Sequence, residues 1–175
     1  MKPWAKQKGF TIVELLIVIV VIGILAAITI VAYSGMQART RDNVRKQDLA
    51  QLSKALKLYA VDNGDYAEAA CGSGGSTSYG WLQYDYDGVN PLKPINMCLV
   101  EGKYLSSIIT DPSGMTSCPG STASTCFAYL KASCPGGTYL YAHLETLPQM
   151  STDLDATCQP SWDTSLGMNY VVKVN

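Results

Sequence analysis

The sequence predicts an α+β protein in which one long N-terminal helix packs on a small antiparallel β-sheet head. Three observations predict this class. An apolar run extends from Leu15 to Ala32, broken only by Gly23 and Thr29. Apolar residues then recur at helical spacing as far as Asn63. The remainder contains short β-branched or aromatic segments and all six cysteines, which predicts disulfide-bonded loops.

The apolar run is long enough to cross a membrane as a helix, for which about 18 residues suffice. Each Ile, Leu or Val between Ile12 and Val31 favours insertion by roughly 0.3–0.6 kcal/mol, against a cost of about 3 kcal/mol for one central acid. The fifteen such residues outweigh Glu14. An acid in such a segment is usually buried against a partner or used. The alternative is an acid that snorkels at the membrane edge.

A secretory signal peptide is another interpretation of this segment, because basic residues precede the apolar run. The run is longer than the usual apolar core of about 7–15 residues, and no Ala-x-Ala cleavage site closes it cleanly. Its apolar character passes directly into a helical pattern. The sequence therefore favours a retained helix.

The junction before the run carries a specific combination. Residues 6–16 read KQKGFTIVELL, and residues 17–33 continue as IVIVVIGILAAITIVAY. A basic leader, a glycine, a phenylalanine and a glutamate four residues later resemble the class III leader junction of type IV pilins and the related pseudopilins. The resemblance implies that a prepilin peptidase cuts after Gly9 and, acting also as a methyltransferase, methylates the new amine of Phe10.

The resemblance also implies a role in assembly for Phe10 and Glu14. An α-amine has an ordinary pKa of about 8 and is largely protonated at neutral pH. In a low-dielectric bundle it needs a carboxylate, which would be the Glu14 of the same or of a neighbouring subunit. A lone buried charge is expensive, so this pair would set the axial register. Gly23 and Ala27 form a small-xxx-small pair that permits close helix packing, although an alanine-containing span also produces such pairs by coincidence.

The second half of the predicted helix is amphipathic. Leu49, Leu52, Leu56 and Tyr59 recur at spacings of three and four and predict one buried stripe against a sheet of the same chain. The charged residues of this half are expected on the other faces, solvated or ion-paired between subunits: Arg41, Asp42, Arg45, Lys46, Asp48, Lys54 and Lys57. The net charge of −1 argues against nucleic-acid binding.

The sequence divides into four parts. Asn63-Gly64 supplies a left-handed helix stop. The predicted parts are a leader peptide (1–9), a hydrophobic transmembrane or filament-core helix (10–33), an amphipathic helix (34–64) and a globular head (65–175).

Short segments of the head predict strands and one helical turn. Residues 127–131, 138–144 and 169–174 are expected to be antiparallel strands, with a fourth near 81–86. Residues 99–105 resemble the short helical turn that precedes the sheet in pseudopilin-like heads.

The cysteines indicate disulfides formed outside the cytoplasm. Six cysteines allow fifteen pairings. Pairing Cys71 with Cys98, Cys118 with Cys126, and Cys134 with Cys158 closes neighbouring loops and is the expected arrangement. The single histidine, His143, and the absence of C-x-x-C disfavour a closed zinc site.

The sequence contains no G-x-S-x-G elbow, no P-loop, no H-E-x-x-H and no G-x-G-x-x-G. His143 falls in a predicted strand and is expected to be a surface or core residue. Residues 85–88 faintly resemble a calcium loop but lack the first acid and the terminal glutamate, so an ordinary aspartate turn is favoured. We therefore expect no enzymatic activity, no cofactor and no metal.

The expected function is that of a type IV pilus (fimbrium) subunit. The resemblance implies a single-pass precursor in the cytoplasmic membrane with its N-terminus inside, polymerised with other copies by a motor and platform proteins into an extracellular filament for adhesion, twitching motility or DNA uptake. One alternative is a pseudopilin of a type II secretion or competence system. Another is a membrane-anchored binding domain that never polymerises.

Overall fold

The structure is a computed structural model, and its chain separates into two compact units, Met1–Ala38 and Arg39–Asn175, described here in turn. The residues that the structure describes are 9–67, 71, 79–83, 93–118, 126–134, 136–148 and 166–175.

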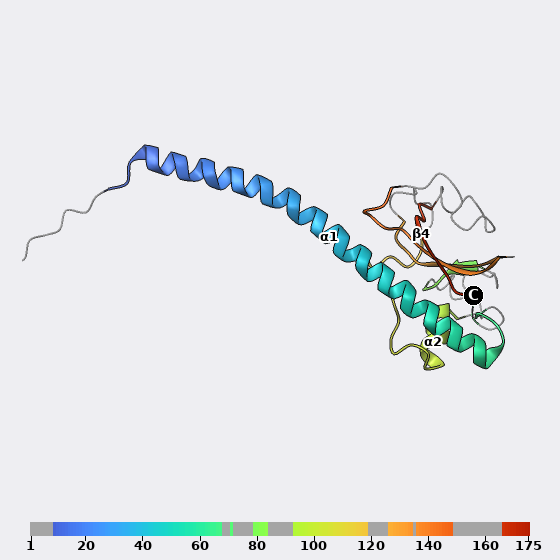
Figure 1. The fold of residues 1–175 in the computed structure, drawn as a ribbon. Helices are drawn as coiled ribbons and strands as arrows, with labels where there is room; N and C mark the ends of the chain where they lie inside the picture. The colour runs from blue at the N-terminus through green and yellow to red at the C-terminus, as the bar shows by residue number, and fades with distance from the viewer. Residues whose placement is uncertain are drawn as a thin grey trace, which may run out of the picture. The chain divides into compact units, whose positions relative to one another are not determined.

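Helix α1 spans Ile12–Asn63, 52 residues, and belongs to both units (Figure 1). The predicted long helix is therefore confirmed. In the first unit the described side chains of α1 are almost all exposed. By length and composition this part of α1 could cross a membrane. The helix stops where predicted, since Gly64 adopts a φ of +82° that non-glycine residues rarely adopt.

The second unit contains a four-stranded antiparallel sheet in the order β1-β2-β3-β4. Its strands are β1 (Tyr79–Trp81), β2 (Leu130–Cys134), β3 (Gly137–Ala142) and β4 (Tyr170–Lys173). The β2–β3 hairpin pairs Cys134 with Gly137, and β3 pairs Leu140 with Val172 of β4. This meander is the small sheet that the sequence predicts.

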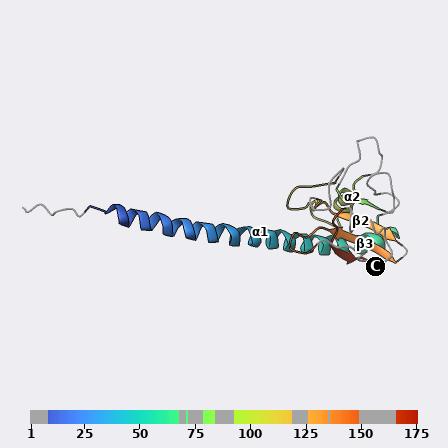
Figure 2. The ribbon, with the colours of Figure 1, turned by 90° about the horizontal axis from the view of Figure 1, so that it is seen from above.

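Strands β3 and β4 present alternate residues to two different apolar clusters. Leu140 and Ala142 of β3 belong to the cluster that contains the second half of α1. Tyr139 and Tyr141 belong to a cluster on the opposite face with the Cys118–Cys126 disulfide. The period-2 geometry of a strand produces this division. The second half of α1 therefore lies along one face of the sheet (Figure 2), and residues around the Cys118–Cys126 disulfide pack against the other face.

The buried stripe of α1 is the predicted one. Leu49, Leu52 and Leu56 are fully buried, and Tyr59 is nearly so. Helix α2 (Ile95–Glu101) adds Ile95 and Leu99 to the same cluster, which confirms a short helix close to the predicted turn at 99–105. Tyr104 ends this segment, and its hydroxyl donates to Asp62 near the end of α1 (2.7 Å).

Two of the three expected disulfides lie within the described residues and are formed. They join Cys71 to Cys98, with Cα atoms 6.1 Å apart, and Cys118 to Cys126, with Cα atoms 5.5 Å apart. Cys158 and the side chain of Cys134 lie outside the described residues, so the third pairing stays a prediction.

Removing either bridge should destabilise the head, and the loss should grow with the logarithm of the number of residues in the loop that the bridge closes. For sequence separations of 27 and 8 residues, chain entropy predicts losses of about 3.5 and 2.5 kcal/mol for the paired Cys71/Cys98→Ala and Cys118/Cys126→Ala variants. Urea unfolding of the full chain in detergent measures both. A greater loss from the shorter loop would contradict the entropic account.

The strand limits differ from those predicted. Residues 127–129 were expected in a strand, but β2 begins at Leu130. The predicted strand 138–144 ends at Ala142, because the Asn169 side chain replaces a strand partner at Leu144: its Oδ1 accepts from the Leu144 N–H (2.7 Å) and its Nδ2 donates to the Leu144 carbonyl (2.9 Å). The fourth strand lies at Tyr79–Trp81, earlier than predicted, and residues 84–86 lie outside the described residues.

Candidate functional site

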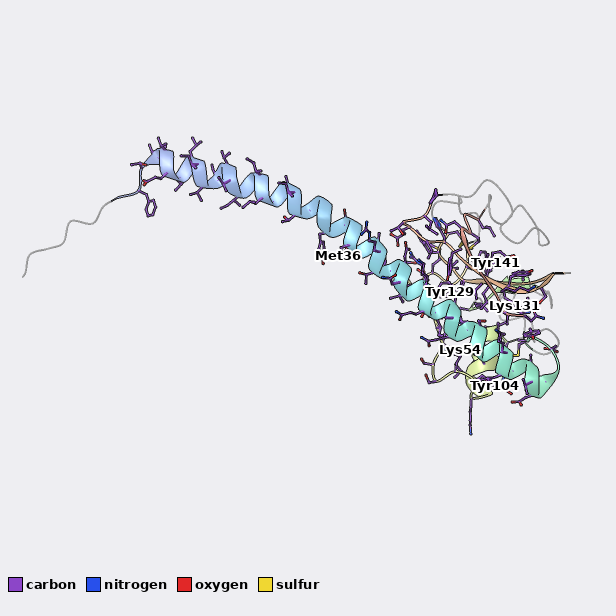
Figure 3. The ribbon with its side chains drawn as sticks, in the orientation of Figure 1. Met36, Lys54, Tyr104, Tyr129, Lys131 and Tyr141 are labelled. Atoms are coloured by element: carbon purple, nitrogen blue, oxygen red, sulfur yellow. A yellow bond between two sulfur atoms is a disulfide. The ribbon has the colours of Figure 1, made fainter. Side chains whose placement is uncertain are left out.

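The first part of α1 presents a long, mainly apolar surface that includes the acid Glu14 (Figure 3). Side chains stand out around the helix, and its large apolar residues from Phe10 to Ile30 are each about half exposed or more. Burying one such Ile, Leu or Val side chain contributes roughly 1.5–3 kcal/mol. Surfaces of this extent in soluble monomers are rare and mark contact with a membrane or another protein.

Glu14 sits in a capping box at the start of α1. Its Oε2 accepts hydrogen bonds from the Thr11 backbone N–H (2.8 Å) and the Thr11 hydroxyl (2.7 Å), and its own N–H donates to Thr11 Oγ1 (3.2 Å). This reciprocal pairing satisfies backbone donors that the first helical turn leaves free. The sequence signal for this capping box is Thr11 followed three residues later by Glu14. The prediction from the sequence assigns Glu14 to assembly and does not include the cap.

The other predicted residues of this segment lie in simple positions. Gly9 and Phe10 precede the helix, and Phe10 is 88% exposed. Gly23 and Ala27 stand one turn apart on α1, and a Cβ added at Gly23 would meet nothing within 4 Å in this chain. Their roles in processing and packing stay predictions.

A buried ionic cluster, called here the Arg45 network, fastens the second half of α1 to two loops of the head. Arg45 is fully buried; its Nε donates to Asp111 Oδ2 (2.6 Å) and its Nη1 to Asp42 Oδ1 (2.9 Å) and Glu145 Oε1 (2.7 Å). Arg41 adds a bidentate pair to Glu145, with distances of 2.7 and 2.5 Å. Two guanidinium groups thus face three carboxylates.

Further hydrogen bonds satisfy the carboxylates of this network. Asp42 accepts from the backbone N–H groups of Glu145 and Thr146, both at 2.8 Å, and from the Thr146 hydroxyl (2.6 Å). Asp111 accepts from the Ser113 N–H (2.8 Å) and hydroxyl (2.5 Å). A buried ion pair is tolerated only when such bonds complete it.

Aromatic rings close the network from one side. The Arg45 guanidinium lies 4.5 Å from the centre of the Phe127 ring, and the His143 ring stacks on Phe127 with ring centres 4.8 Å apart. His143 is buried, and its Nδ1 lies 3.1 Å from the Cys126 carbonyl oxygen. Of the two expected positions for His143, at the surface or in the core, the structure shows the core position.

The network corrects the prediction that Asp42 and Arg45 are solvated or pair between subunits. Both are buried and bonded within their own chain. A signal was present in the sequence: Asp42 and Arg45 continue the three-and-four spacing of Leu49, Leu52 and Leu56 and so lie on the buried stripe. A charged side chain need not be exposed to solvent, because a charge that is paired as in Arg45 and Asp42 can be buried.

The electrostatic environment favours the ionised forms of the network. The hydrogen bond from Arg41 holds the pKa of Glu145 at about 2, against an ordinary 4.5, despite partial burial. Burial opposes ionisation of Asp42, but hydrogen bonds from Thr146 and Glu145 outweigh it and lower its pKa. Burial also opposes the charge on Arg45, but its bonds to Asp111 and Glu145 raise the pKa of the guanidinium.

The head should lose stability in two stages as the pH falls. Burial lowers the pKa of His143 below its ordinary 6.5. Below about pH 6.5 the imidazole is therefore protonated in the unfolded chain but still neutral in the folded head. Because the unfolded state binds the extra proton, the stability of the head declines as the pH falls below about 6.5. Glu145, with its pKa depressed from 4.5 to about 2, contributes stability that is complete above pH 4.5 and lost as the pH falls through about 2.

Urea unfolding at a series of pH values measures this profile. His143→Phe keeps a ring beside Phe127 and should abolish the first decline, whereas Glu145→Gln should remove part of the second. A wild-type stability that is constant between pH 7 and 5 would contradict the assignment to His143.

The fold and the site together define a class: a chain with a small disulfide-bonded α+β head and a long helix whose first part has an exposed apolar surface. The profile of the prokaryotic N-terminal methylation motif matches residues 4–30. No solved structure gives a significant match to the chain.

Characterised relatives narrow the class. The chain is 35% identical to the type II secretion system core protein G of Escherichia coli over 66 residues, 38% of this chain and 46% of that protein. It is 39% identical to the type IV major fimbrial protein FimA of Dichelobacter nodosus over 70 residues, and 38% identical to the type IV major pilin protein PilA of Myxococcus xanthus over 65 residues; these matches cover 40% and 37% of this chain. Over the matched part, the chain is therefore similar both to type IV pilins and to type II secretion core proteins. It spans less than half the length of these relatives: 46%, 45% and 30%.

Proposed function

We propose that this chain is a subunit of a type IV pilus. In this proposal the precursor is held in the membrane by the first part of α1, cut after Gly9, methylated on Phe10, and polymerised through that helix into a surface filament. The supporting observation is the exposed apolar surface from Phe10 to Ile30, interrupted by the single acid Glu14. The similarity to two major pilins supports the same role.

Polymerisation replaces one apolar environment by another. Lipid covers the apolar surface of the precursor, and neighbouring helices cover it in the filament, so the net gain per subunit is small and an assembly motor is required. The charge at the start of α1 differs between the precursor and the processed chain in the filament. Cleavage creates an amine at Phe10, and a second copy can offer it the Glu14 carboxylate, which in the isolated chain is bonded to Thr11.

N-terminal sequencing and mass analysis of sheared surface filaments test the proposal. The expected result is a mature chain that begins at Phe10 and carries one added methyl group. Filaments that lack this chain, or a chain that keeps residues 1–9, would refute it.

A pseudopilin is the second candidate, favoured by the similarity to the type II secretion system core protein G. An antibody against the head discriminates the two by electron microscopy. Long labelled surface filaments support the pilin, and short structures confined to the cell envelope support the pseudopilin. A processed chain that crosslinks to no other copy would indicate a membrane-anchored domain instead.

A further inference from the structure

Met115 lies in a loop of the head and holds a backbone group through its sulfur. Its Sδ accepts a hydrogen bond from the Phe127 N–H (3.3 Å) and lies 3.5 Å from Cys118 Sγ. The second distance is a packing contact, because the Cys118 sulfur is part of a disulfide and carries no hydrogen. Met115 therefore fastens the Phe127 backbone through a group that oxidants can change chemically.

Phe127 connects this sulfur to the Arg45 network. Its ring stacks on His143, and the Arg45 guanidinium lies 4.5 Å from the ring centre. The preceding residue, Cys126, is disulfide-bonded, and its carbonyl oxygen lies 3.1 Å from Nδ1 of His143. The ring that covers Arg45 is therefore carried by a backbone segment that Met115 helps to hold.

Exposure sets Met115 apart from the other methionines that the structure describes. Met36 and Met97 are 65% and 43% exposed. Met168 is fully buried in the apolar cluster on the face of the sheet opposite α1. Met115 packs against the same cluster but is only partly buried. A small oxidant can therefore reach the Met115 sulfur, and that sulfur has a structural contact to lose.

Hydrogen peroxide can oxidise a thioether to a sulfoxide without another reactant. The sulfur lone pair attacks one peroxide oxygen, so that an S–O bond forms and the O–O bond breaks. The departing hydroxide takes the proton of the transferred hydroxyl group and leaves as water. Sulfur loses two electrons and the peroxide gains them. The product is a polar side chain, and methionine sulfoxide reductases can reverse the step.

The sulfoxide cannot keep the contact with Phe127. If the oxygen adds where the N–H points, it must fit between two atoms that are only 3.3 Å apart, the Met115 sulfur and the Phe127 nitrogen. If it adds elsewhere, the sulfur carries a partial positive charge and no longer attracts the N–H dipole. Both products also place a polar oxygen against an apolar cluster, which costs free energy. Oxidation should therefore release the Phe127 segment and loosen the cover of Arg45.

We propose that Met115 is an oxidative modification site, at which a peroxide destabilises the head by releasing Phe127 from the sulfur. The inference goes beyond the proposed function, because it concerns the head alone and does not depend on whether the chain forms filaments. Disulfides persist in oxidising environments, and the described part of the head contains two. A site that responds to oxidants fits such an environment.

Controlled oxidation of the full chain in detergent with hydrogen peroxide tests the proposal. Peptide mapping by mass spectrometry measures the fraction of sulfoxide at each methionine, and urea unfolding measures the stability of the same samples. Oxidation of Met115 should lower the folding equilibrium constant by about fivefold or more, the effect of leaving one partly buried N–H without its acceptor.

Two substitutions separate Met115 from the other methionines. Met115→Leu conserves the side-chain volume but cannot form a sulfoxide, so the stability of this variant should not respond to peroxide. Met97→Leu is the matched control, because it removes an exposed methionine from α2, and its stability should fall on oxidation as that of the wild type does.

Hydrogen exchange at the Phe127 amide gives a second measurement that needs no variant. Exchange should become faster in step with the fraction of sulfoxide at Met115. Three results would overturn the proposal: no sulfoxide at Met115 in the folded head, unchanged stability and unchanged Phe127 exchange when Met115 is oxidised, or an equal loss of stability in oxidised Met115→Leu.

Discussion

Replacing Arg45 with methionine is expected to lower the free energy of unfolding of the head by about 3–5 kcal/mol. The substitution keeps most of the side-chain volume but leaves the buried carboxylates of Asp42 and Asp111 without their main cation. A small domain has a total stability of about 5–15 kcal/mol. The expected loss is therefore a large fraction of the stability of the head.

The same network supplies its own controls. Arg39→Met removes an exposed arginine from the same helix and should change stability by no more than about 0.5 kcal/mol. Adding Asp111→Asn to Arg45→Met should recover part of the loss, because it removes one uncompensated charge. Urea unfolding of the full chain in detergent, followed by tyrosine and tryptophan fluorescence, measures all three. A loss below about 1 kcal/mol for Arg45→Met would contradict the network's role.

Replacing Glu14 with glutamine is expected to reduce filament yield by at least about a hundredfold, on the order of the cost of an unpaired buried charge. Glutamine can still complete the capping box with Thr11, as it commonly does at this helix position. The start of α1 should therefore be preserved, and so should membrane insertion and cleavage after Gly9. Only the negative charge offered to the Phe10 amine is lost.

Glu14→Val removes both the charge and the cap and should assemble no better than the glutamine variant. Thr29→Ala is the control, because it changes a polar residue in the apolar run without changing charge. Immunoblots of sheared filaments and of the membrane fraction provide the comparison. Wild-type yield from Glu14→Gln would show that capping, and not charge, is the function of Glu14.

The helical part of the fold could be predicted because its signals are local. The apolar run, the three-and-four spacing from Leu49 to Tyr59 and the Asn63-Gly64 stop each depend on neighbouring residues. The Cys71–Cys98 and Cys118–Cys126 pairings were also predictable, because each closes a short loop.

The strand limits could not be predicted because apolar character reports burial and not ladder pairing. Phe127 and Tyr129 precede β2, yet Tyr129 is buried in the core and Phe127 covers Arg45. The Arg45 network escaped prediction for a related reason. Its partners Asp111 and Glu145 lie 66 and 100 residues away from Arg45, and no spacing rule joins positions so distant.

The processing junction of the candidate site is also a local signal. Gly9, Phe10 and Glu14 are neighbours in sequence, so the junction could be identified from the chain alone.

The two-faced sheet has a consequence for how such a chain can diversify. Leu140 and Ala142 pack on the helix, whereas Tyr139, Tyr141 and the Cys118–Cys126 disulfide form a separate buried layer on the opposite face. Changes in that layer leave the helix-facing residues in place. Residues on that face can therefore change during evolution while the packing of α1 on the sheet is kept.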